Sequence, residues 1–359
     1  MLGTLKSLRG FGWPVAMIAG LALASAVRAQ NNDEIIAQCR SDDFTVAIKA
    51  CTTLIETGRN LDIGYGNRGN AYVSRAKALH IKGDEDRAIA DYDAYIRINP
   101  ASGKGFIMRG NAYADQEKYE QALADFTEAL RFEPDLRAMI HANRGDILNR
   151  KGDYDRAIED FDEAIRLAAD PRQVSVIHIG RAFAYAKKKN YDQAIADMDE
   201  AGKTLPKIME TPLFLLGRES VYFDKGDYAH AIADETELVR VSPNASIGFS
   251  KRCWSRASLN QFYPALEDCK EALRLDPKSA YAFGGRGLAD LKMGKLDEAI
   301  SDFTESLRLA GDSAESLYGR GVAKLRKGDK NGGQADIAAA EKMQDDVAGR
   351  YTRYGVSVN

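Results

Sequence analysis

The sequence predicts an all-α fold of stacked helix pairs, and three observations lead to this prediction. Helix-forming residues such as Ala, Leu, Glu and Arg are plentiful, while only 9 of the 359 residues are proline. Apolar side chains recur at helical spacing within each segment. The same pattern returns every 34 to 37 residues along most of the chain. Because no single unit can bury its own apolar stripe, such units stack on one another.

The first 29 residues differ from everything that follows. Lys6 and Arg9 precede an apolar stretch from Trp13 to Ala24, and Val27 and Ala29 supply the small side chains of a cleavage site. This stretch is shorter than the roughly 20 residues of a membrane-spanning helix. We therefore expect residues 1–29 to be a signal peptide and the mature protein to be periplasmic or secreted. An uncleaved anchor is the alternative, and after cleavage we expect no spanning segment.

Four cysteines follow the expected signal peptide, and an even number in an oxidising compartment permits two disulfides. Stacked units contact only their neighbours, which favours local pairs: Cys39 with Cys51, and Cys253 with Cys269. Each disulfide would join the two helices of one hairpin. Buried free thiols that pack as small apolar groups are the alternative. Neither spacing matches a metal site, so no metal is expected.

An Arg followed by an Asp 16 residues later is the most regular mark of the repeat, and it defines eight units. The first unit is the exception, because seven additional residues separate its Arg from its Asp. A small residue, Ala in seven units and Gly in the last, stands three positions before each Asp. The pairs are Arg68/Asp91, Arg109/Asp125, Arg144/Asp160, Arg181/Asp197, Arg218/Asp234, Arg252/Asp268, Arg286/Asp302 and Arg320/Asp336.

Each unit reads as two amphipathic helices joined by a tight turn. The first helix carries the pattern Arg-Gly-x2-Tyr, and the second carries Tyr-x2-Ala-x3-Phe-x2-Ala, which places one apolar stripe on each helix. Turns such as Gly152-Asp153 separate the two helices, and a Pro such as Pro134 closes several units. The second unit, residues 109–134, shows the complete pattern.

These slots resemble the tetratricopeptide repeat over about residues 33 to 345. The resemblance implies a right-handed superhelical solenoid of helix-turn-helix repeats that serves as a protein-binding scaffold. Under this interpretation, residues 30–61 form a divergent N-terminal capping hairpin and residues 62–345 hold the eight repeats. Residues 346–359 form a C-terminal capping helix. The resemblance is specific for the fold and weak for the partner, because the family binds many different proteins.

The repeated Arg departs from the family pattern, in which many members carry Leu at this slot. The slot faces the second helix, and a buried Arg is costly unless it is paired. The Asp 16 residues later is the obvious partner. We therefore expect a structural Arg–Asp ladder, and a ladder of anion-binding arginines is the alternative.

If the family geometry holds, the inner face of the solenoid carries first-helix residues five and two positions before, and two and five after, each repeat Arg. Early units place a mixed polar surface there, while later units place apolar residues there. An apolar patch of this extent usually marks a partner site, with aromatic residues as anchors. Self-burial against the solenoid or a second copy is the alternative. The expected partner-binding residues are Phe183, Leu213, Leu216, Phe223, Trp254, Tyr281, Leu288 and Tyr318.

Enzymatic activity is not expected. No two of the four histidines have the spacing of a metal site, and no Gly-rich phosphate loop follows a strand, so we expect neither catalytic residues nor a cofactor. The formal net charge of −3 gives no basic field, which argues against nucleic acid. The sequence thus predicts a scaffold that holds an extended peptide or helix of a partner protein in its inner groove. A self-assembling homodimer and a non-catalytic subunit of a cell-envelope enzyme complex are the alternatives.

Overall fold

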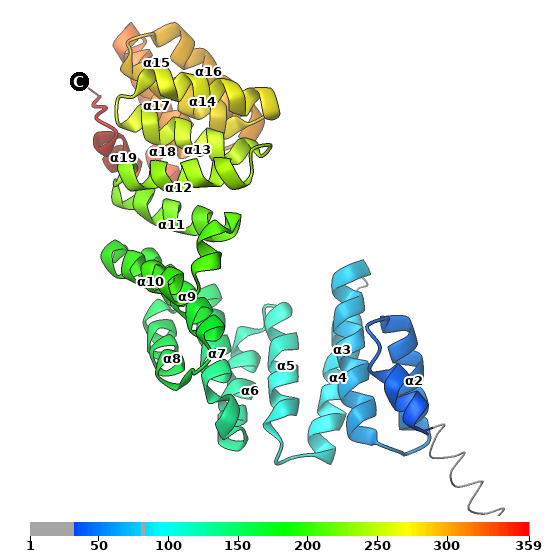
Figure 1. The fold of residues 1–359 in the computed structure, drawn as a ribbon. Coiled ribbons are helices and arrows are strands. Elements are labelled where there is room, and N and C mark those ends of the chain that lie inside the picture. Colours follow the sequence, from blue (N-terminus) through cyan, green and yellow to red (C-terminus); the bar gives the residue numbers. More distant parts are fainter. Residues whose placement is uncertain (1–31, 80–82, 359) are drawn as a thin grey trace, which may run out of the picture. The chain divides into compact units, whose positions relative to one another are not determined.

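The computed structural model describes residues 32–79 and 83–358, and within these residues the secondary structure is helical, with no strand (Figure 1). The predicted all-α solenoid of helix pairs is confirmed. The expected signal peptide, residues 1–29, lies outside the described residues. The chain divides into two compact units, unit 1 ending at Leu167 and unit 2 beginning at Ala168.

Unit 1 begins with a helix over residues 32–39, which pairs with α2. Three helix pairs follow, α3 with α4, α5 with α6 and α7 with α8. The bounds are α2 Phe44–Glu56, α3 Leu61–Leu79, α4 Asp84–Ile98, α5 Gly103–Asp115, α6 Tyr119–Phe132, α7 Arg137–Lys151 and α8 Tyr154–Leu167.

Unit 2 contains five further helix pairs, from α9 with α10 to α17 with α18, and ends in the short helix α19. The bounds are α9 Pro171–Lys187, α10 Tyr191–Thr204, α11 Pro212–Lys225, α12 Tyr228–Val241, α13 Ser246–Ser258, α14 Phe262–Leu275, α15 Ala280–Lys292, α16 Leu296–Ala310, α17 Ala314–Lys327, α18 Lys330–Met343 and α19 Val347–Arg353. In each pair the odd-numbered helix is the first helix of a repeat and the even-numbered helix is the second.

Several repeats require Gly after the repeat Arg in the first helix, because an aromatic ring of the second helix lies against this position. A Cβ on Gly145 would be 2.9 Å from the ring of Phe161, and a Cβ on Gly287 would be 3.1 Å from the ring of Phe303. Both distances are too short for an ordinary contact, so a larger residue would force the two helices apart. This close approach is how the repeat pattern of Gly and Phe becomes a tightly packed helix pair.

All eight Arg–Asp pairs are bonded in the same way. The Nε and Nη2 atoms of each Arg donate to the two oxygens of the Asp 16 residues later, or 23 later in the first unit, at 2.5 to 2.9 Å. Two-pronged contact with a planar guanidinium is the strongest form of this interaction, and it fixes the angle between the paired helices. Every one of these carboxylates is buried: Asp91, Asp125, Asp160, Asp197, Asp234, Asp268, Asp302 and Asp336.

The ladder carboxylates are part of the interior and do not form an accessible site. Asp91 and Asp125 are each 5% exposed, and Asp302 is 7% exposed. Both oxygens of each of these three carboxylates already accept a hydrogen bond from the arginine of the same repeat. None of the three is therefore available to a partner or ligand from solution. These three carboxylates instead bond the second helix of each repeat to its first helix.

The third nitrogen of several ladder arginines reaches the preceding repeat. Nη1 of Arg109 donates to Asp93, and Nη1 of Arg218 donates to Asp199, in each case on the second helix of the repeat before. Nη1 of Arg252 donates in the same way to the hydroxyl of Thr236. Each acceptor stands two residues after a ladder Asp. A guanidinium therefore joins neighbouring repeats as well as the two helices of one repeat, which the Leu of other family members cannot do.

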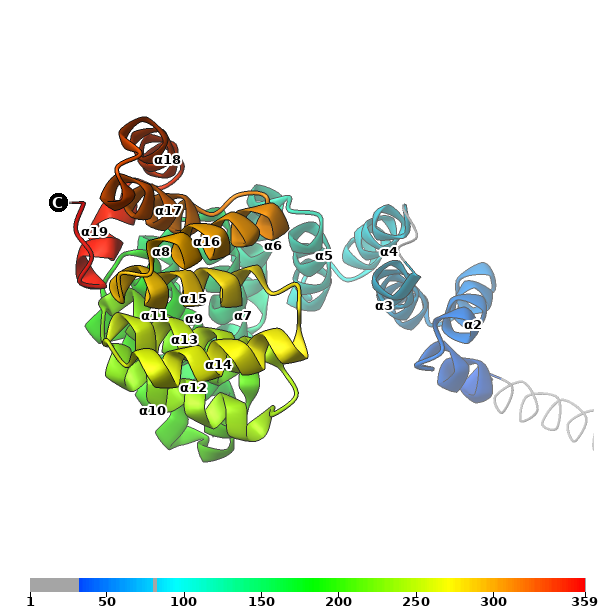
Figure 2. The same cartoon turned by 90° about the horizontal axis from the view of Figure 1, so that it is seen from above.

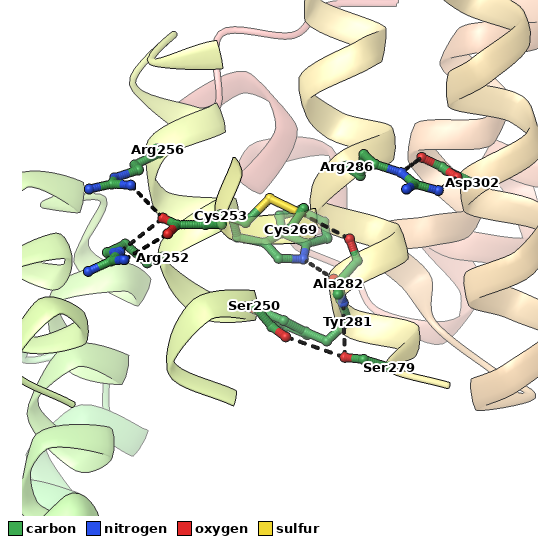
Figure 3. Close-up of a disulfide and its surroundings, with 12 residues drawn as sticks. Ser250, Arg252, Cys253, Arg256, Cys269, Ser279, Tyr281, Ala282, Arg286 and Asp302 are labelled. Atoms are coloured by element: carbon green, nitrogen blue, oxygen red, sulfur yellow. Dashed lines mark hydrogen bonds and ion pairs between the residues drawn. A yellow bond between two sulfur atoms is a disulfide. The ribbon is translucent and has the colours of Figure 1, made fainter. Parts of the chain in front are cut away.

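Both expected disulfides are present. Cys39–Cys51 joins the first helical segment to α2, and Cys253–Cys269 joins α13 to α14 (Figure 3). Cys253 follows the ladder Arg252 and Cys269 follows the ladder Asp268, so the second disulfide stands where other units bring Gly and Phe together. A covalent bond therefore replaces the usual packing contact of this repeat.

Candidate functional site

The first helices of unit 2 carry a row of exposed apolar side chains at positions expected to face the inside of the solenoid, and we call this expected surface the inner face. Each stands five residues before a repeat Arg, near the beginning of a first helix: Val176 on α9, Leu213 on α11, Ile247 on α13 and Tyr281 on α15. Leu213 is 83% exposed, Val176 is 61% exposed, and both Ile247 and Tyr281 are 39% exposed. We call these four residues the apolar row. An exposed row that continues across successive repeats is a feature of interaction surfaces.

The other expected partner-binding residues fall into three groups. Phe183 is exposed on α9, and Leu216 and Phe223 are half-buried on α11. Trp254, Leu288 and Tyr318 belong instead to the buried core of unit 2. The prediction that these last three residues offer an accessible surface is therefore wrong.

For Trp254 and Tyr318 the physical reason is the C-terminal segment, residues 347–358, which packs against both rings. Tyr354 lies between Phe223, Tyr228 and Trp254, with ring centroids 5.9 to 6.0 Å from each. Tyr351 packs on Tyr318 with the centroids 4.8 Å apart. Both views show α19 beside unit 2 helices that lie much earlier in the sequence (Figures 1 and 2). Residues 347–358 thus contact earlier repeats of unit 2 as well as the last one.

Polar contacts hold the C-terminal segment at three of the first helices. The ammonium group of Lys292 on α15 donates to the carbonyl oxygens of Tyr354, Ala257 and Ser258. Burial lowers the pKa of Lys292 to about 8. Arg350 pairs with Asp224 on α11 and Glu315 on α17, each at 3.3 Å.

A cavity of about 520 Å³ remains beside the C-terminal segment. Trp254 and Tyr281 form one wall, Arg350 and Tyr354 of the C-terminal segment form another, and the beginning of α17 closes a third side. The indole Nε1 of Trp254 donates to the carbonyl oxygen of Tyr281 at 2.8 Å, which fixes the first wall. This volume falls within the range of ligand clefts, and Tyr281 links it to the apolar row.

Two buried glutamates next to this cavity were not recognised from the sequence. Glu219 follows the ladder Arg218 and Glu235 follows the ladder Asp234, so they stand where other units carry Gly and Phe. Both are almost completely buried. These two positions depart from the repeat pattern, and that departure could have identified them from the sequence. A carboxyl group at a position that normally packs Gly against Phe does not contribute to apolar packing.

The two glutamates form a polar cluster with residues of α13. Lys251 lies 2.6 Å from Glu219, and the Ser255 hydroxyl donates to Glu235 at 2.8 Å. Burial raises the pKa of Glu235 to about 8, and the charge of Glu219 adds to this effect. Glu235 is therefore protonated near neutral pH, while Glu219 forms the ion pair with Lys251. The ammonium group of Lys251 also lies 5.5 Å from the ring centroid of Tyr281, which connects this cluster to the cavity wall.

The first helices of unit 1 place polar and apolar side chains together. Asn70, Asn111 and Asp146 each stand two residues after a repeat Arg, and they line a cavity of about 400 Å³ between α3, α5 and α7. Asp146 is partly exposed to solvent, but neighbouring protein atoms exclude water from its carboxyl group. This desolvation raises the pKa of Asp146 to about 6. This cavity offers amide and carboxyl groups beside apolar side chains such as Met108 and Ile147.

Two of the histidines bond to ladder carboxylates. The Nδ1 atoms of His141 and His178 lie 2.9 and 2.8 Å from Asp160 and Asp197, which are ladder residues. Burial alone would raise the pKa of these two carboxyls, but bonds from the neighbouring Arg and His lower it. Both histidines therefore support the ladder.

Of the described residues, none belongs to a helix long and apolar enough to cross a bilayer.

The fold and the inner faces define a repeat scaffold for protein interaction. Sequence profiles of the tetratricopeptide repeat match residues 107–173 and 285–332, and a further profile of the same description matches residues 69–102. The matched segments are thus tetratricopeptide repeats, and the structure gives the remaining helix pairs the same architecture. No curated protein matches the sequence significantly.

Solved structures show the same fold at low sequence identity. A tetratricopeptide repeat protein from Parabacteroides merdae is 18% identical with a TM-score of 0.60, and the match covers 71% of this chain and 99% of that one. The C-terminal part of a repeat protein from Cytophaga hutchinsonii is 15% identical with a TM-score of 0.54, covering 70% and 98%. The Cut9–Hcn1 structure is 17% identical with a TM-score of 0.50, covering 82% of this chain and 54% of that one.

Proposed function

We propose that this protein is an exported, non-catalytic scaffold that holds an extended peptide or helix of a partner protein on the inner face of unit 2. The observation that carries the proposal is the apolar row, in which four successive first helices each expose a large apolar side chain five residues before the repeat Arg. Exposed Leu and Val side chains lose unfavourable contact with water when a partner covers them. One such contact per repeat would set the register of an elongated segment.

Export is supported by the two disulfides, which form and persist in oxidising compartments. The expected signal peptide agrees with this location. The non-catalytic role is supported by the family, whose members are generally scaffolds. The polar groups of unit 2 form pairs that hold helices together, such as the ladder and the Lys251–Glu219 ion pair.

Site-specific photo-crosslinking tests the proposed surface. A photoreactive phenylalanine analogue placed at Leu213 reports on the apolar row, and the same analogue at Tyr263 is the matched control. Tyr263 is 79% exposed on α14, a second helix, and so lies outside the apolar row. In cells, we expect a discrete crosslinked partner from position 213 and none from position 263.

Two other results would change the conclusion. A crosslink from position 213 to a second copy of the chain, together with a dimeric mass in solution, would favour the self-assembling homodimer. Equal crosslinking from both positions, or none from either, would exclude the apolar row as the binding surface.

A further inference from the structure

We propose that the C-terminal segment, residues 347–358, is a replaceable intramolecular ligand of the unit 2 inner face, and that a short partner helix with two aromatic residues three positions apart takes its place. This inference rests on the proposed function and adds the chemistry of the partner and the regulation of its access. The segment itself shows what the surface accepts, because it is already seated there.

Two aromatic side chains of the segment occupy the surface that the sequence assigned to a partner. Tyr351 on α19 and Tyr354, the residue that follows the helix, stand three positions apart, and both are buried. Tyr354 covers Trp254, and Tyr351 covers Tyr318. The Tyr351 hydroxyl also donates to the carbonyl oxygen of Glu315 at 2.7 Å. A partner helix needs the same pair of rings to cover the same residues.

The polar contacts of the segment recognise features that any short helix could supply. Lys292 donates to the main-chain carbonyl of Tyr354, just after the end of α19, and a cation there suits the C-terminal end of any helix. Arg326 likewise donates to the main-chain carbonyl of Ser357. Arg350 adds a charged side chain from the segment itself, which pairs with carboxylates on α11 and α17. A basic residue one position before the first aromatic would reproduce this pairing.

The segment is attached in a way that allows exchange. α19 has only seven residues, a length at which a helix has little stability without its packing partner. Residues 344–346 join it to α18, so it can leave without unfolding a repeat. The cavity of about 520 Å³ borders Tyr354 and Arg350, and it gives an incoming segment a place to make its first contacts. Val176, Leu213 and Ile247 of the apolar row are exposed while the segment is in place, and Tyr281 lies at the edge of the covered area.

Binding of a synthetic peptide in trans tests the proposal. The probe is a fluorescein-labelled peptide of residues 344–359, added to three full-length proteins: the parent, Tyr351→Ala/Tyr354→Ala, and the control Thr352→Ala, whose side chain is exposed on the same helix. A tethered segment competes at an effective concentration in the millimolar range, so the parent should bind the peptide weakly. We expect the double variant to bind at least tenfold more tightly than the parent and the control. A folded double variant that binds no more tightly would overturn the proposal.

Hydrogen exchange of the unmodified parent gives a second test that needs no variant. The amides of Tyr354 and Val356 donate to carbonyl oxygens within the C-terminal segment, and the amide of Arg350 donates to the carbonyl oxygen of Asp346 just before it. If the segment leaves reversibly, these amides should exchange at least tenfold faster than the amides in the middle of α15. Equal rates would identify the segment as permanent core and overturn the proposal, including in the case where the double variant fails to fold.

The two proposals can fail separately. Leu213→Asp alters the apolar row without touching residues 347–358, so it should abolish partner crosslinking and leave peptide binding to the tail variant unchanged. Loss of crosslinking selectivity with normal peptide exchange would reject the apolar row alone. Normal crosslinking with no peptide exchange would reject only the replaceable ligand.

Discussion

Replacing Arg218 with Met tests whether the Arg–Asp ladder holds the repeats together. Arg218 donates to both oxygens of Asp234, at 2.9 and 2.7 Å. The Arg side chain is 13% exposed and the Asp side chain is 6% exposed, so water and salt screen the pair only weakly. Met keeps most of the length of the side chain but removes the charge. Asp234 is then left buried without its guanidinium.

The expected cost follows from this burial. Removing one partner of a buried ion pair typically costs about 3–5 kcal/mol, because the remaining charge is uncompensated. Arg218 also donates to Asp199 at 3.2 Å, but Asp199 is 45% exposed, so loss of this bond adds little. We expect Arg218→Met to lower the free energy of unfolding by about 3–4 kcal/mol. The double variant Arg218→Met/Asp234→Leu removes both charges and should recover all but about 1 kcal/mol.

Urea unfolding followed by far-UV circular dichroism measures both effects. The control is Arg308→Met, since Arg308 pairs with Glu305 at the surface, where water screens the pair, and its loss should leave the urea midpoint almost unchanged. The reasoning is refuted if Arg218→Met unfolds at the same urea concentration as the parent, or if the double variant is less stable than Arg218→Met alone. An unchanged urea midpoint for Arg218→Met is also the result expected if the repeat arginines bind an anion and do not stabilise the fold.

Three further predictions concern stability. Replacing Cys253 and Cys269 by Ser should lower the free energy of unfolding by about 3 kcal/mol, because the disulfide closes a loop with a sequence separation of 16. Urea unfolding with and without dithiothreitol measures this, and dithiothreitol should shift the midpoint less in the variant than in the parent. Glu235→Gln should stabilise the protein by about 2 kcal/mol more near pH 7 than near pH 5. The folded-state pKa of about 8 exceeds the ordinary value, so the parent loses stability as the pH rises from about 4.5 towards 8. Thermal unfolding of both proteins across this range measures the effect, and a stability difference between them that does not change with pH would contradict the assignment. Glu117→Gly should stabilise by about 0.5–1 kcal/mol in the same urea assay, because Glu117 has a φ of +58° that Gly adopts without steric cost; an unchanged midpoint would argue against this strain.

The repeat pattern predicted the packing that is local in sequence. The ladder partners of Arg218 and Arg252 lie 16 residues away, within one helix pair, and the spacing alone identified them. The same holds for Cys253 and Cys269, whose slots are matched across α13 and α14. A periodic sequence describes contacts between neighbours well, because the same contact must recur in every unit.

The pattern could not predict a contact that occurs once. Trp254 stands at an inner-face position, and its neighbours in sequence suggest that it is accessible. Tyr354, which covers it, comes from beyond the last repeat, and no repeat spacing relates the two residues. Glu219 and Glu235 could have been recognised as exceptions to the Gly and Phe slots, but their partner Lys251 belongs to the next repeat and only the fold brings it close.

The exceptions to the pattern lie together, and their position bears on how the inner face works. The repeat of α11 and α12 replaces the Gly–Phe contact with Glu219 and Glu235, and the next repeat replaces it with the Cys253–Cys269 disulfide. These two repeats also contact Tyr354 through Phe223 and Trp254. A surface whose cover is exchanged must stay ordered while it is uncovered, and it then cannot depend on the cover for its packing. The Lys251–Glu219 ion pair, the Ser255–Glu235 hydrogen bond and the disulfide join α11 to α14 through bonds that do not involve residues 347–358, whereas a Gly–Phe contact relies on tight packing around it. The two unusual repeats therefore lie where a replaceable ligand requires the most stable support.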